Sequence, residues 1–238
     1  MSALSSDETK RYARHIVLRG VGGEGQQKLK SARVLVVGAG GLGSPIIAYL
    51  AAAGVGTLGV VDHDEVSLSN LQRQVIHTVK AIGGPKAQSA GHFVAGLNPH
   101  VIFVAHTERL TADNAAALIG AYDLVIDGTD NFSTRVIAAS AAAAAGLPLV
   151  SGAVSMFDGQ VTVFAPGGPG FGDLYPDTPD EADLPACEVV GVLGAVTGVI
   201  GTLMAMEAIK LITGIGQPLV GRLLLYDGRE ARFSELTY

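Results

Sequence analysis

The sequence predicts an α/β fold with a mixed, mostly parallel β-sheet, and three observations support that prediction. Short apolar strands alternate with helical segments through the body of the chain, which is typical of parallel strands joined by right-handed crossovers. A glycine-rich turn, residues 38–43, joins the first strand to the first apolar helix, as in Rossmann-like nucleotide-binding domains. Near the end of the chain, Asp227-Gly228 separates two strand-like segments and favours antiparallel C-terminal strands.

The individual elements follow from apolar runs and from their start and stop signals. The expected strands occupy residues 33–38, 57–62, 100–105, 123–127, 148–153, 159–164, 221–226 and 230–236. The expected helices occupy residues 44–53, 85–97, 112–119 and 132–145. Pro85 fits the first turn of a helix, Thr111 fits an N-cap, and Asn98-Pro99 marks the end of a helix.

Two segments differ from this alternation of strands and helices. Residues 5–30 are polar, helical and basic, so we expect a helical N-terminal arm. Residues 165–187 hold five of the ten prolines and five acidic residues. This composition predicts a mobile crossover loop or a functional lid, and the alternative is a disordered insertion without a role.

Composition restricts the class of protein. The chain has 238 residues, of which 48% are hydrophobic and 16% charged, and this suits a globular fold, expected here as a single domain over residues 1–238. The formal net charge of -6 argues against a nucleic-acid partner. The single cysteine, Cys187, excludes an internal disulfide framework and fits a reducing compartment. Since the N-terminus lacks a signal-peptide pattern, we expect a cytoplasmic protein.

Residues 189–206 carry no charge and are about long enough to be considered as a membrane span. Glycines interrupt the stretch, Glu207 and Lys210 continue the same helical pattern, and a basic flank is missing. We therefore expect a core helix and no membrane contact. Gly194 and Gly198 would let that helix pack close to the sheet.

The glycine turn is the first sign of a ligand site. Backbone N–H groups at a helix N-terminus face an anion, and glycines let the anion approach. The glycines of this turn are Gly38, Gly40, Gly41 and Gly43. Asp62 ends the next strand, about 20 residues further on, where a carboxylate can bond a ribose hydroxyl. These residues together predict a nucleotide-binding site.

Polar side chains follow the second strand, at the expected mouth of this site. They are Asp64 and, within residues 67–74, Asn70, Arg73 and Gln74. Asn70 and Arg73 are three positions apart, so one helical turn would put both on one face. An amide and a guanidinium there suit the oxygens of a triphosphate. The alternative is a polar loop with one solvated arginine.

Lys86 and Asp130 are two further charged candidates. Lys86 lies at a helix start, where a cation opposes the helix dipole, so its placement is easier to understand if an anion binds there. The alternative is a surface lysine. Asp130 follows a strand end, where a carboxylate can hold Mg²⁺ beside phosphates. The alternative for Asp130 is the N-cap of the helix expected over residues 132–145.

The charged and polar candidate residues distinguish between two reactions, hydride transfer with NAD and adenylation with ATP. A glycine turn and an acid alone favour an NAD-dependent oxidoreductase, but a nicotinamide enzyme has no use for a triphosphate clamp and a metal. In adenylation, a carboxylate attacks the α-phosphorus of ATP and pyrophosphate leaves. The carboxylate is already ionised at neutral pH, so the protein has only to align the groups and neutralise charge. The residues favour adenylation.

Eight segments together resemble the MoeB/ThiF (HesA/MoeB/ThiF) adenylyltransferases, prokaryotic relatives of ubiquitin-activating enzymes. In chain order they are Arg11-Tyr12-x-Arg14, GAGGLGS (38–44), SLSNLQRQ (67–74), GxPK (83–86), DGTDNFSTR (127–135), GQVTVF (159–164), GVLG (191–194) and LLLYD (223–227). The resemblance implies a ThiF-type adenylation domain, usually a homodimer. It also implies adenylation of the C-terminal glycine carboxylate of a ubiquitin-like sulfur carrier ending in Gly-Gly, in a molybdopterin or thiamine type pathway.

The resemblance implies roles for single residues as well. The residues that it assigns to ATP are Gly40, Gly41, Asp62, Asn70, Arg73 and Lys86. Asp130 would bind magnesium or otherwise support adenylation. Arg14 would reach the ATP of the partner subunit, which makes the dimer necessary for activity. The alternative for Arg14 is one solvated charge in a basic helix.

The chain departs from the pattern in which many members bind a structural zinc with two CxxC pairs. The first pair would follow the GQVTVF strand, where this chain has residues 170–173, and the second would lie near Tyr238. One cysteine cannot make a Cys₄ site, so we expect no zinc and a more mobile loop over residues 165–187. Cys187 aligns with a cysteine that some relatives use for covalent chemistry, and the alternative is an inert thiol.

Two further alternatives share the fold. The same chemistry could act on another carboxylate, in a peptide or a modified tRNA base, although a basic extension for tRNA is missing. A non-catalytic scaffold would bind ATP without turnover. Intact Arg73, Lys86 and Asp130 argue against the scaffold.

Overall fold

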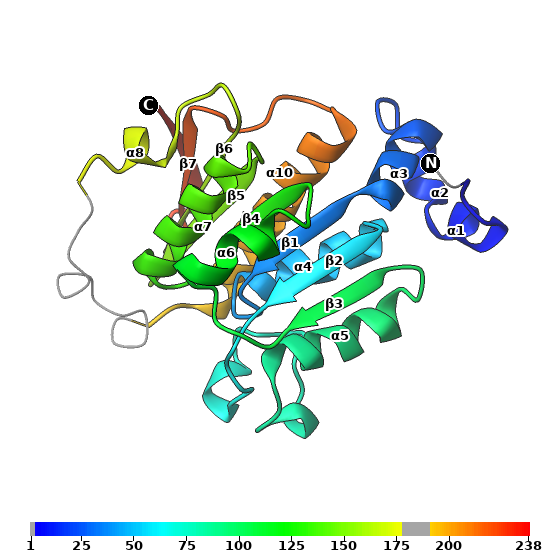
Figure 1. Ribbon diagram of the computed structural model, residues 1–238, viewed down its shortest axis with the longest axis horizontal. Helices are drawn as coiled ribbons and strands as arrows, with labels where there is room; N and C mark the ends of the chain where they lie inside the picture. Colours follow the sequence, from blue (N-terminus) through cyan, green and yellow to red (C-terminus); the bar gives the residue numbers. More distant parts are fainter. Residues whose placement is uncertain (1–2, 178–190) are drawn as a thin grey trace.

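An eight-stranded mixed sheet forms the centre of the computed structural model, which describes residues 3–177 and 191–238 (Figure 1). The strands are β1 (Arg33–Val37), β2 (Thr57–Val61), β3 (Ile102–His106), β4 (Leu124–Asp127), β5 (Leu149–Ser155), β6 (Asp158–Phe164), β7 (Arg222–Asp227) and β8 (Arg232–Thr237). Their order is β3-β2-β1-β4-β5-β6-β7-β8. The strands from β3 to β5 are parallel, and β6, β7 and β8 are antiparallel to their neighbours. The predicted mixed sheet is confirmed.

The helices match the predicted order as well. They are α1 (Ser6–Arg11), α2 (Ala13–Ile16), α3 (Gly22–Ser31), α4 (Gly43–Ala53), α5 (Lys86–Leu97), α6 (Ala112–Ile119), α7 (Phe132–Ala144), α8 (Phe171–Leu174) and α10 (Gly194–Thr213), with 3-10 turns η1 (Leu68–Asn70) and η2 (Val79–Ala81). Thr111 is the N-cap of α6 and Asn98 the C-cap of α5, as predicted. Pro85 is the N-cap of α5 and does not lie in its first turn.

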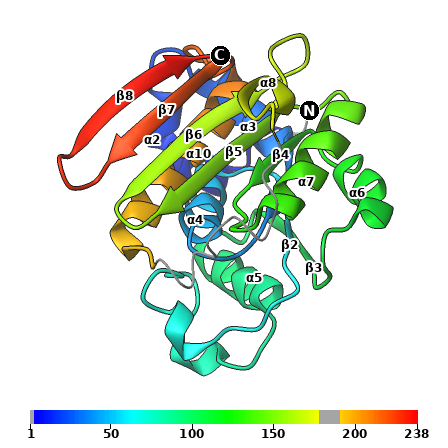
Figure 2. The same ribbon diagram turned by 90° about the vertical axis from the view of Figure 1, so that its left-hand side faces the viewer.

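Helices cover both faces of the parallel part of the sheet (Figure 2). Val34 and Val36 of β1 face the layer of α4, α5 and α10, whereas Leu35 and Val37 face α6 and α7. Successive side chains of a strand point to opposite faces, so a strand covered on both sides must be apolar throughout. This explains the unbroken apolar run of β1.

The strand order reverses direction between β1 and β4. The chain leaves β1 through α4 towards β2 and β3, and it returns through α6 to β4 on the other side of β1. Val37, the last residue of β1, lies level with Val61 of β2 and Asp127 of β4. Ligands of open α/β sheets bind at such a point, outside the carboxyl ends of the strands.

The apolar helix α10 belongs to the core. Among the described residues it is the one helix long and apolar enough to cross a membrane. It packs against α4, β5 and β6, and Ile200 and Met204 are fully buried there. Packing against the sheet therefore explains the apolar composition of α10, as predicted for a core helix.

The predicted role of Gly194 and Gly198 in that packing is wrong. A Cβ atom at Gly198 would meet nothing within 4 Å, and one at Gly194 would lie 2.4 Å from the carbonyl oxygen of Gln72. The close approach is at Gly201, where a Cβ atom would lie 2.4 Å from Pro45 of α4. Gly201 is therefore the glycine that lets α10 pack closely, and it packs against α4. The sequence spacing did not identify this glycine.

The segment predicted as a loop over residues 165–187 contains the helical turn α8. Its Phe171 packs against Phe132 of α7 and Phe164 of β6, with ring centroids 5.7 Å apart in each pair. Aromatic side chains anchor this part of the segment, which composition alone did not reveal. Residues 178–187, including Cys187, lie outside the described residues, and the mobility of the segment stays a prediction.

Candidate nucleotide-binding site

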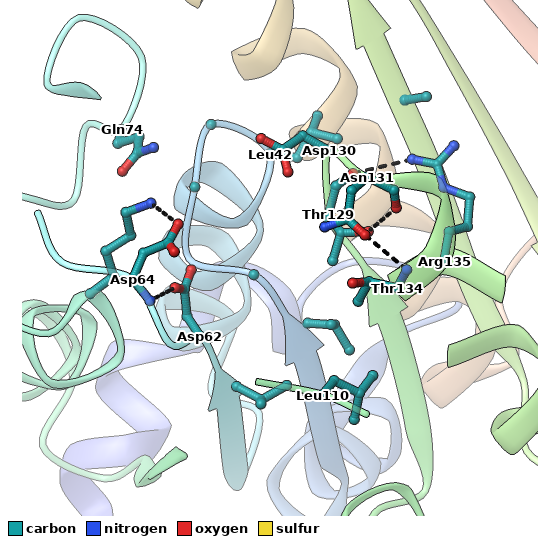
Figure 3. Close-up of a pocket in the computed structure, with 18 of the residues that line it drawn as sticks. Leu42, Asp62, Asp64, Gln74, Leu110, Thr129, Asp130, Asn131, Thr134 and Arg135 are labelled. Carbon is teal, nitrogen blue, oxygen red and sulfur yellow. Dashed lines mark hydrogen bonds and ion pairs between the residues drawn. The ribbon is translucent and has the colours of Figure 1, made fainter. Parts of the chain in front are cut away.

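A cavity of about 380 Å³ opens at the carboxyl ends of β1, β2 and β4, where the strand order reverses (Figure 3). In Figure 3 the glycine turn runs between two groups of side chains, with Asp62, Asp64 and Gln74 on one side and Asp130 and Asn131 on the other. The volume lies within the range of small-molecule and cofactor pockets. The cavity therefore occupies the position predicted for a nucleotide.

The glycine turn forms the middle of this cavity. Gly38, Gly40 and Gly41 line it. Gly38 has a φ of 94°, a conformation that favours glycine, and a Cβ atom at Gly43 would lie 2.0 Å from the carbonyl oxygen of Gly38. Gly43 does not line the cavity. It lets α4 begin directly against the turn.

Asp62 fastens the turn to the end of β2. Its Oδ2 atom accepts a hydrogen bond of 2.7 Å from the backbone N–H of Ala39, and its Oδ1 atom accepts one of 2.8 Å from Asp64 N–H. Each carboxylate oxygen has a second lone pair. Asp62 lines the cavity, so it can still accept a hydrogen bond from a ribose hydroxyl.

Lys86 lies buried at the first position of α5 and pairs with Asp64. The Lys86 Nζ atom lies 2.8 Å from Asp64 Oδ2, and Lys86 N–H donates to the Asp64 carbonyl at 2.9 Å. Burial alone would raise the pKa of Asp64, but the hydrogen bond and charge of Lys86 outweigh it and lower that pKa. The ammonium has three N–H donors, and Asp64 uses one of them. Lys86 therefore keeps donors for an anion in the cavity.

Residues 67–74 place Arg73 and Gln74 in the cavity but not Asn70. The Arg73 Nη1 atom donates to the Ser69 carbonyl at 3.2 Å, which leaves other guanidinium N–H groups for a ligand. The Asn70 carbonyl accepts the N–H groups of Arg73, at 3.1 Å, and Gln74, at 3.0 Å, so a helical turn runs from Asn70 to Arg73 as predicted. The common face of the Asn70 and Arg73 side chains stays a prediction.

Gln74 is almost fully buried, with 3% of its surface exposed, beside the glycine turn. A Cβ atom at Gly40 would lie 3.6 Å from its Nε2 atom. Its Oε1 atom has no hydrogen-bond partner among the described residues. Gln74 therefore offers the cavity an unused acceptor.

The opposite wall depends on the buried carboxylate of Asp127 at the end of β4. It accepts hydrogen bonds from Thr129 N–H, at 3.1 Å, and Ser151 Oγ, at 3.1 Å, and forms an ion pair with Arg135 Nε at 3.0 Å. Arg135 also donates to the carbonyls of Thr129 and Gly152. This network fixes the loop between β4 and α7.

Asp130 projects from that loop into the cavity. Its side chain is exposed, lines the cavity and has no hydrogen-bond or ion-pair partner among the described residues. The alternative role as N-cap is wrong, because Asn131 caps α7 by accepting a 2.8 Å hydrogen bond from Thr134 N–H. Asn131 directly follows a residue with the same capping preference, so the sequence could not separate the two.

Sequence reasoning missed several residues that complete the site. His77 lies beneath the glycine turn, and Nε2 of this residue is 2.9 Å from the Ala39 carbonyl oxygen. Arg135 and Asp127 form the buried pair described above, and Arg109 lines the cavity beside His63. His77 had a usable signal, since it closely follows the segment that ends at Gln74, and Asp127 and Arg135 are the first and last residues of the quoted segment DGTDNFSTR. The position of Arg109 depends on chain contacts that spacing does not reveal.

Arg14 lies far from this cavity within its own chain. It is an exposed residue of α2, and α2 lies beyond the amino ends of the strands, whereas the cavity opens at their carboxyl ends (Figure 1). The structure therefore does not bring Arg14 to the cavity of the same chain.

Comparison with known proteins identifies the family. The ThiF family matches residues 12–238. The chain is 51% identical to a probable adenylyltransferase/sulfurtransferase MoeZ of Mycobacterium tuberculosis, over 99% of this chain and 62% of that protein. It is 48% identical to a sulfur carrier protein adenylyltransferase of Thermus thermophilus, over 98% of this chain and 88% of that protein. The chain thus spans less than two thirds of the length of MoeZ.

Solved structures support the fold. A structure of PaaA superposes with a TM-score of 0.85 at 23% identity, over 100% of this chain and 75% of that chain. A structure of E. coli MccB with ATP superposes with a TM-score of 0.81 at 19% identity, over 95% of this chain and 71% of that chain. The match over residues 12–238 and the sequence identities together establish that the chain belongs to the ThiF family.

Proposed function

We propose that this chain adenylates the C-terminal glycine carboxylate of a ubiquitin-like sulfur carrier ending in Gly-Gly and releases pyrophosphate. The observation that carries the proposal is the arrangement of charge around the glycine turn. Arg73, Lys86 and Asp130 all line the cavity, and the carboxylate of Asp130 has no hydrogen-bond or ion-pair partner among the described residues. The relatives named as adenylyltransferases support it, including one named for a sulfur carrier.

Binding follows from the geometry of the cavity. Asp62 accepts a hydrogen bond from the ribose, and the N–H groups of Gly40 and Gly41 face the phosphates. Arg73 and Lys86 offer unused donors to the phosphate oxygens. Gln74 adds an amide beside the same turn, and the proposal gives Asn70 no direct contact with ATP.

Catalysis then requires alignment and neutralisation of charge rather than proton transfer. The carboxylate of the carrier is ionised at neutral pH, so no general base is needed. As the bond to the leaving pyrophosphate breaks, negative charge grows on its oxygens, and the cations of Arg73 and Lys86 stabilise that charge. Lys86 is held rigidly by Asp64, so the cation needs little reorganisation during the reaction.

Asp130 fits the requirements of a magnesium ligand. Mg²⁺ prefers oxygen ligands and is commonly held by one or two carboxylates together with substrate phosphates. The carboxylate of Asp130 faces the cavity free of partners among the described residues, across the glycine turn from Asp64, which pairs with Lys86. When bound, the ion would neutralise phosphate charge. Zinc has no part in the proposal, in keeping with the single cysteine.

We also propose that the chain works as a cytoplasmic homodimer in which Arg14 reaches the ATP of the partner subunit. Arg14 is exposed and does not line the cavity of its own chain, so a role at an ATP site requires a second chain. Val17, in the next turn of the chain, is 75% exposed, and Leu18 is 53% exposed. Large apolar side chains at this exposure favour a covered surface.

The test is ATP–pyrophosphate exchange with purified carriers. Exchange should require a carrier that ends in Gly-Gly and should be lost when the last glycine is removed. A short peptide and a tRNA serve as competing carboxylate substrates. Exchange driven equally by either of them, or NAD binding with hydride transfer and no exchange, would contradict the proposal.

A further inference from the structure

His77 is a buried side chain that the mechanism above does not use. It is 6% exposed and lies between two elements of the ATP site. Its Nε2 atom lies 2.9 Å from the carbonyl oxygen of Ala39 in the glycine turn, and its Nδ1 atom lies 2.9 Å from Ser89 Oγ in α5. A carbonyl oxygen can only accept, so Nε2 carries the proton and Nδ1 accepts from the Ser89 hydroxyl.

These contacts close a ring that joins the glycine turn to the helix bearing Lys86. The members of this ring, which we call the turn clamp, are Ala39, Asp62, Asp64, Lys86, Ser89 and His77. Ser89 lies three residues after Lys86, in the same first turn of α5. The clamp therefore fixes the spacing between the turn and the buried ammonium.

His77 and Asp62 hold Ala39 from both sides. Asp62 binds its N–H group, and His77 binds its carbonyl group. A trans peptide is planar, so the N–H of Gly40 points away from the Ala39 carbonyl. No intramolecular acceptor is found for that N–H group among the described residues, and Gly40 lines the cavity.

Glycine gives this peptide the freedom to rotate. Gly40 has no Cβ atom, and a rotation of the 39–40 peptide would turn a carbonyl oxygen towards the phosphates in place of an N–H group. A carbonyl dipole facing an anion repels it. A donor beneath the turn prevents that rotation, and His77 is the residue that supplies it.

We propose that His77 is a positioning residue for the phosphates of ATP, which holds the 39–40 peptide with its N–H group towards the cavity. This inference rests on the proposed function. It predicts that loss of the Nε2 donor weakens the binding of phosphates while leaving the binding of the nucleoside unchanged.

Two substitutions separate the two hydrogen bonds of His77. The His77→Asn variant places its amide near the Nδ1 position and cannot reach Ala39, whereas the amide of His77→Gln extends to the Nε2 position. Binding of ATP and of adenosine is measured by calorimetry without a carrier. We expect His77→Asn to weaken ATP binding about tenfold. We expect His77→Gln to stay within about threefold of the parent chain, and adenosine binding to be unchanged in both variants.

Two further variants distinguish positioning from general stability. His77→Met keeps a similar volume without a donor and should lose ATP affinity as His77→Asn does. Thr162 lies on β6, outside the cavity. Thr162→Val removes its buried hydroxyl, which donates to the Arg222 carbonyl at 2.9 Å. It should lower the melting temperature without changing the ratio of ATP to adenosine affinity.

Each outcome of these measurements supports or contradicts the positioning role of His77. If the parent chain binds ATP and both His77→Asn and His77→Met bind it equally well, the positioning role is overturned and the proposed function stands. An equal loss of ATP and adenosine binding, or failure of all His77 variants to fold while Thr162→Val folds, also overturns it. A parent chain that binds no ATP overturns the proposed function and this inference together.

Discussion

Charged side chains at the carboxyl ends of the strands differ in how firmly the fold holds them. Lys86 and Asp127 are buried and paired, whereas Asp130 is exposed and has no partner among the described residues. A side chain with ion-pair or hydrogen-bond partners within the fold contributes to stability as well as to function. A side chain without such partners contributes to function alone. This contrast makes Asp130 the cleanest residue for a test of chemistry.

Replacement of Asp130 by alanine should abolish pyrophosphate exchange and leave stability unchanged. The carboxylate makes no described contact whose loss would destabilise the fold, while the proposed magnesium loses its protein ligand. Exchange kinetics and thermal unfolding measure the two effects. Normal exchange in Asp130→Ala would show that the magnesium assignment is wrong.

The charge of His77 should make folding stability depend on pH. Burial lowers the pKa of His77, and the Lys86 charge adds to this, while the Ala39 carbonyl and Asp62 act in the opposite direction. The unfolded chain then binds a proton below about pH 6.5 that the folded chain resists, so the free energy of unfolding decreases as pH falls from there to the folded pKa. Below the pKa of His77 in the folded chain, His77 is protonated in both the folded and the unfolded chain, so it no longer lowers the free energy of unfolding as pH falls further.

Urea unfolding at a series of pH values measures this decrease. The His77→Gln variant lacks the titrating ring, so its free energy of unfolding should fall less than that of the parent chain between pH 7 and pH 5. Parallel curves for the two chains would contradict the assignment of a neutral, buried His77.

At the scale of elements, the backbone of α10 packs closely against α4 at a glycine of α10. The backbone of Gly201 lies so close to α4 that a Cβ atom would meet Pro45 at 2.4 Å and the Leu42 carbonyl oxygen at 2.6 Å. Since Leu42 directly precedes the first residue of α4, this contact also supports the glycine turn. The packing of one helix on another thus helps to position the glycine turn of the candidate nucleotide site.

Two substitutions in α10 should therefore have opposite effects. Gly201→Ala should lower the free energy of unfolding by about 1–3 kcal/mol, because α10 must move away from α4. Gly198→Ala should raise it by about 0.5–1 kcal/mol, because a Cβ atom there meets nothing within 4 Å and alanine favours a helix. Urea unfolding measures both. A loss of stability in Gly198→Ala as large as in Gly201→Ala would contradict this view of the interface.

At the scale of the whole molecule, we propose that the complete site is formed by two chains. The helix α2, which carries Arg14, and the cavity lie at opposite ends of the strands, so Arg14 does not reach the cavity of its own chain (Figure 1). A homodimer in which each arm reaches the other cavity would give two complete sites.

Mixed dimers test this sharing. Arg14→Ala and Arg73→Ala chains should each be inactive in exchange alone, and mixing them should restore activity. One of the two sites in a mixed dimer regains both arginines, so up to half of the parent activity per dimer is expected. Mixed dimers that form, as checked by tagged co-purification, yet recover nothing would rule out the shared site.

Much of the fold could be predicted because its signals are local. The apolar runs, the Thr111 cap, Asn98 and the glycine turn depend on neighbouring residues, so the strands and the four predicted helices lie within two residues of their expected ends. Asp62, Lys86 and Arg73 could be placed for the same reason, since strand ends and helix starts fix where their backbones lie. Asn70 does not line the cavity, and a Cβ atom at Gly198 meets no neighbour within 4 Å, because both depend on tertiary neighbours that spacing did not show.

The sequence by itself determined the order of the elements, the glycine turn and the charged residues near it, because short-range sterics and hydrophobic periodicity act along the chain. Only the tertiary structure decided that His77 lies beneath Ala39, that Arg135 pairs with Asp127 and that α10 meets α4 at Gly201. The first and last of these contacts join residues distant in sequence, and the ion pair of Arg135 with Asp127 joins the two ends of one loop and helix. Their geometry depends on how whole elements pack, which no local pattern specifies.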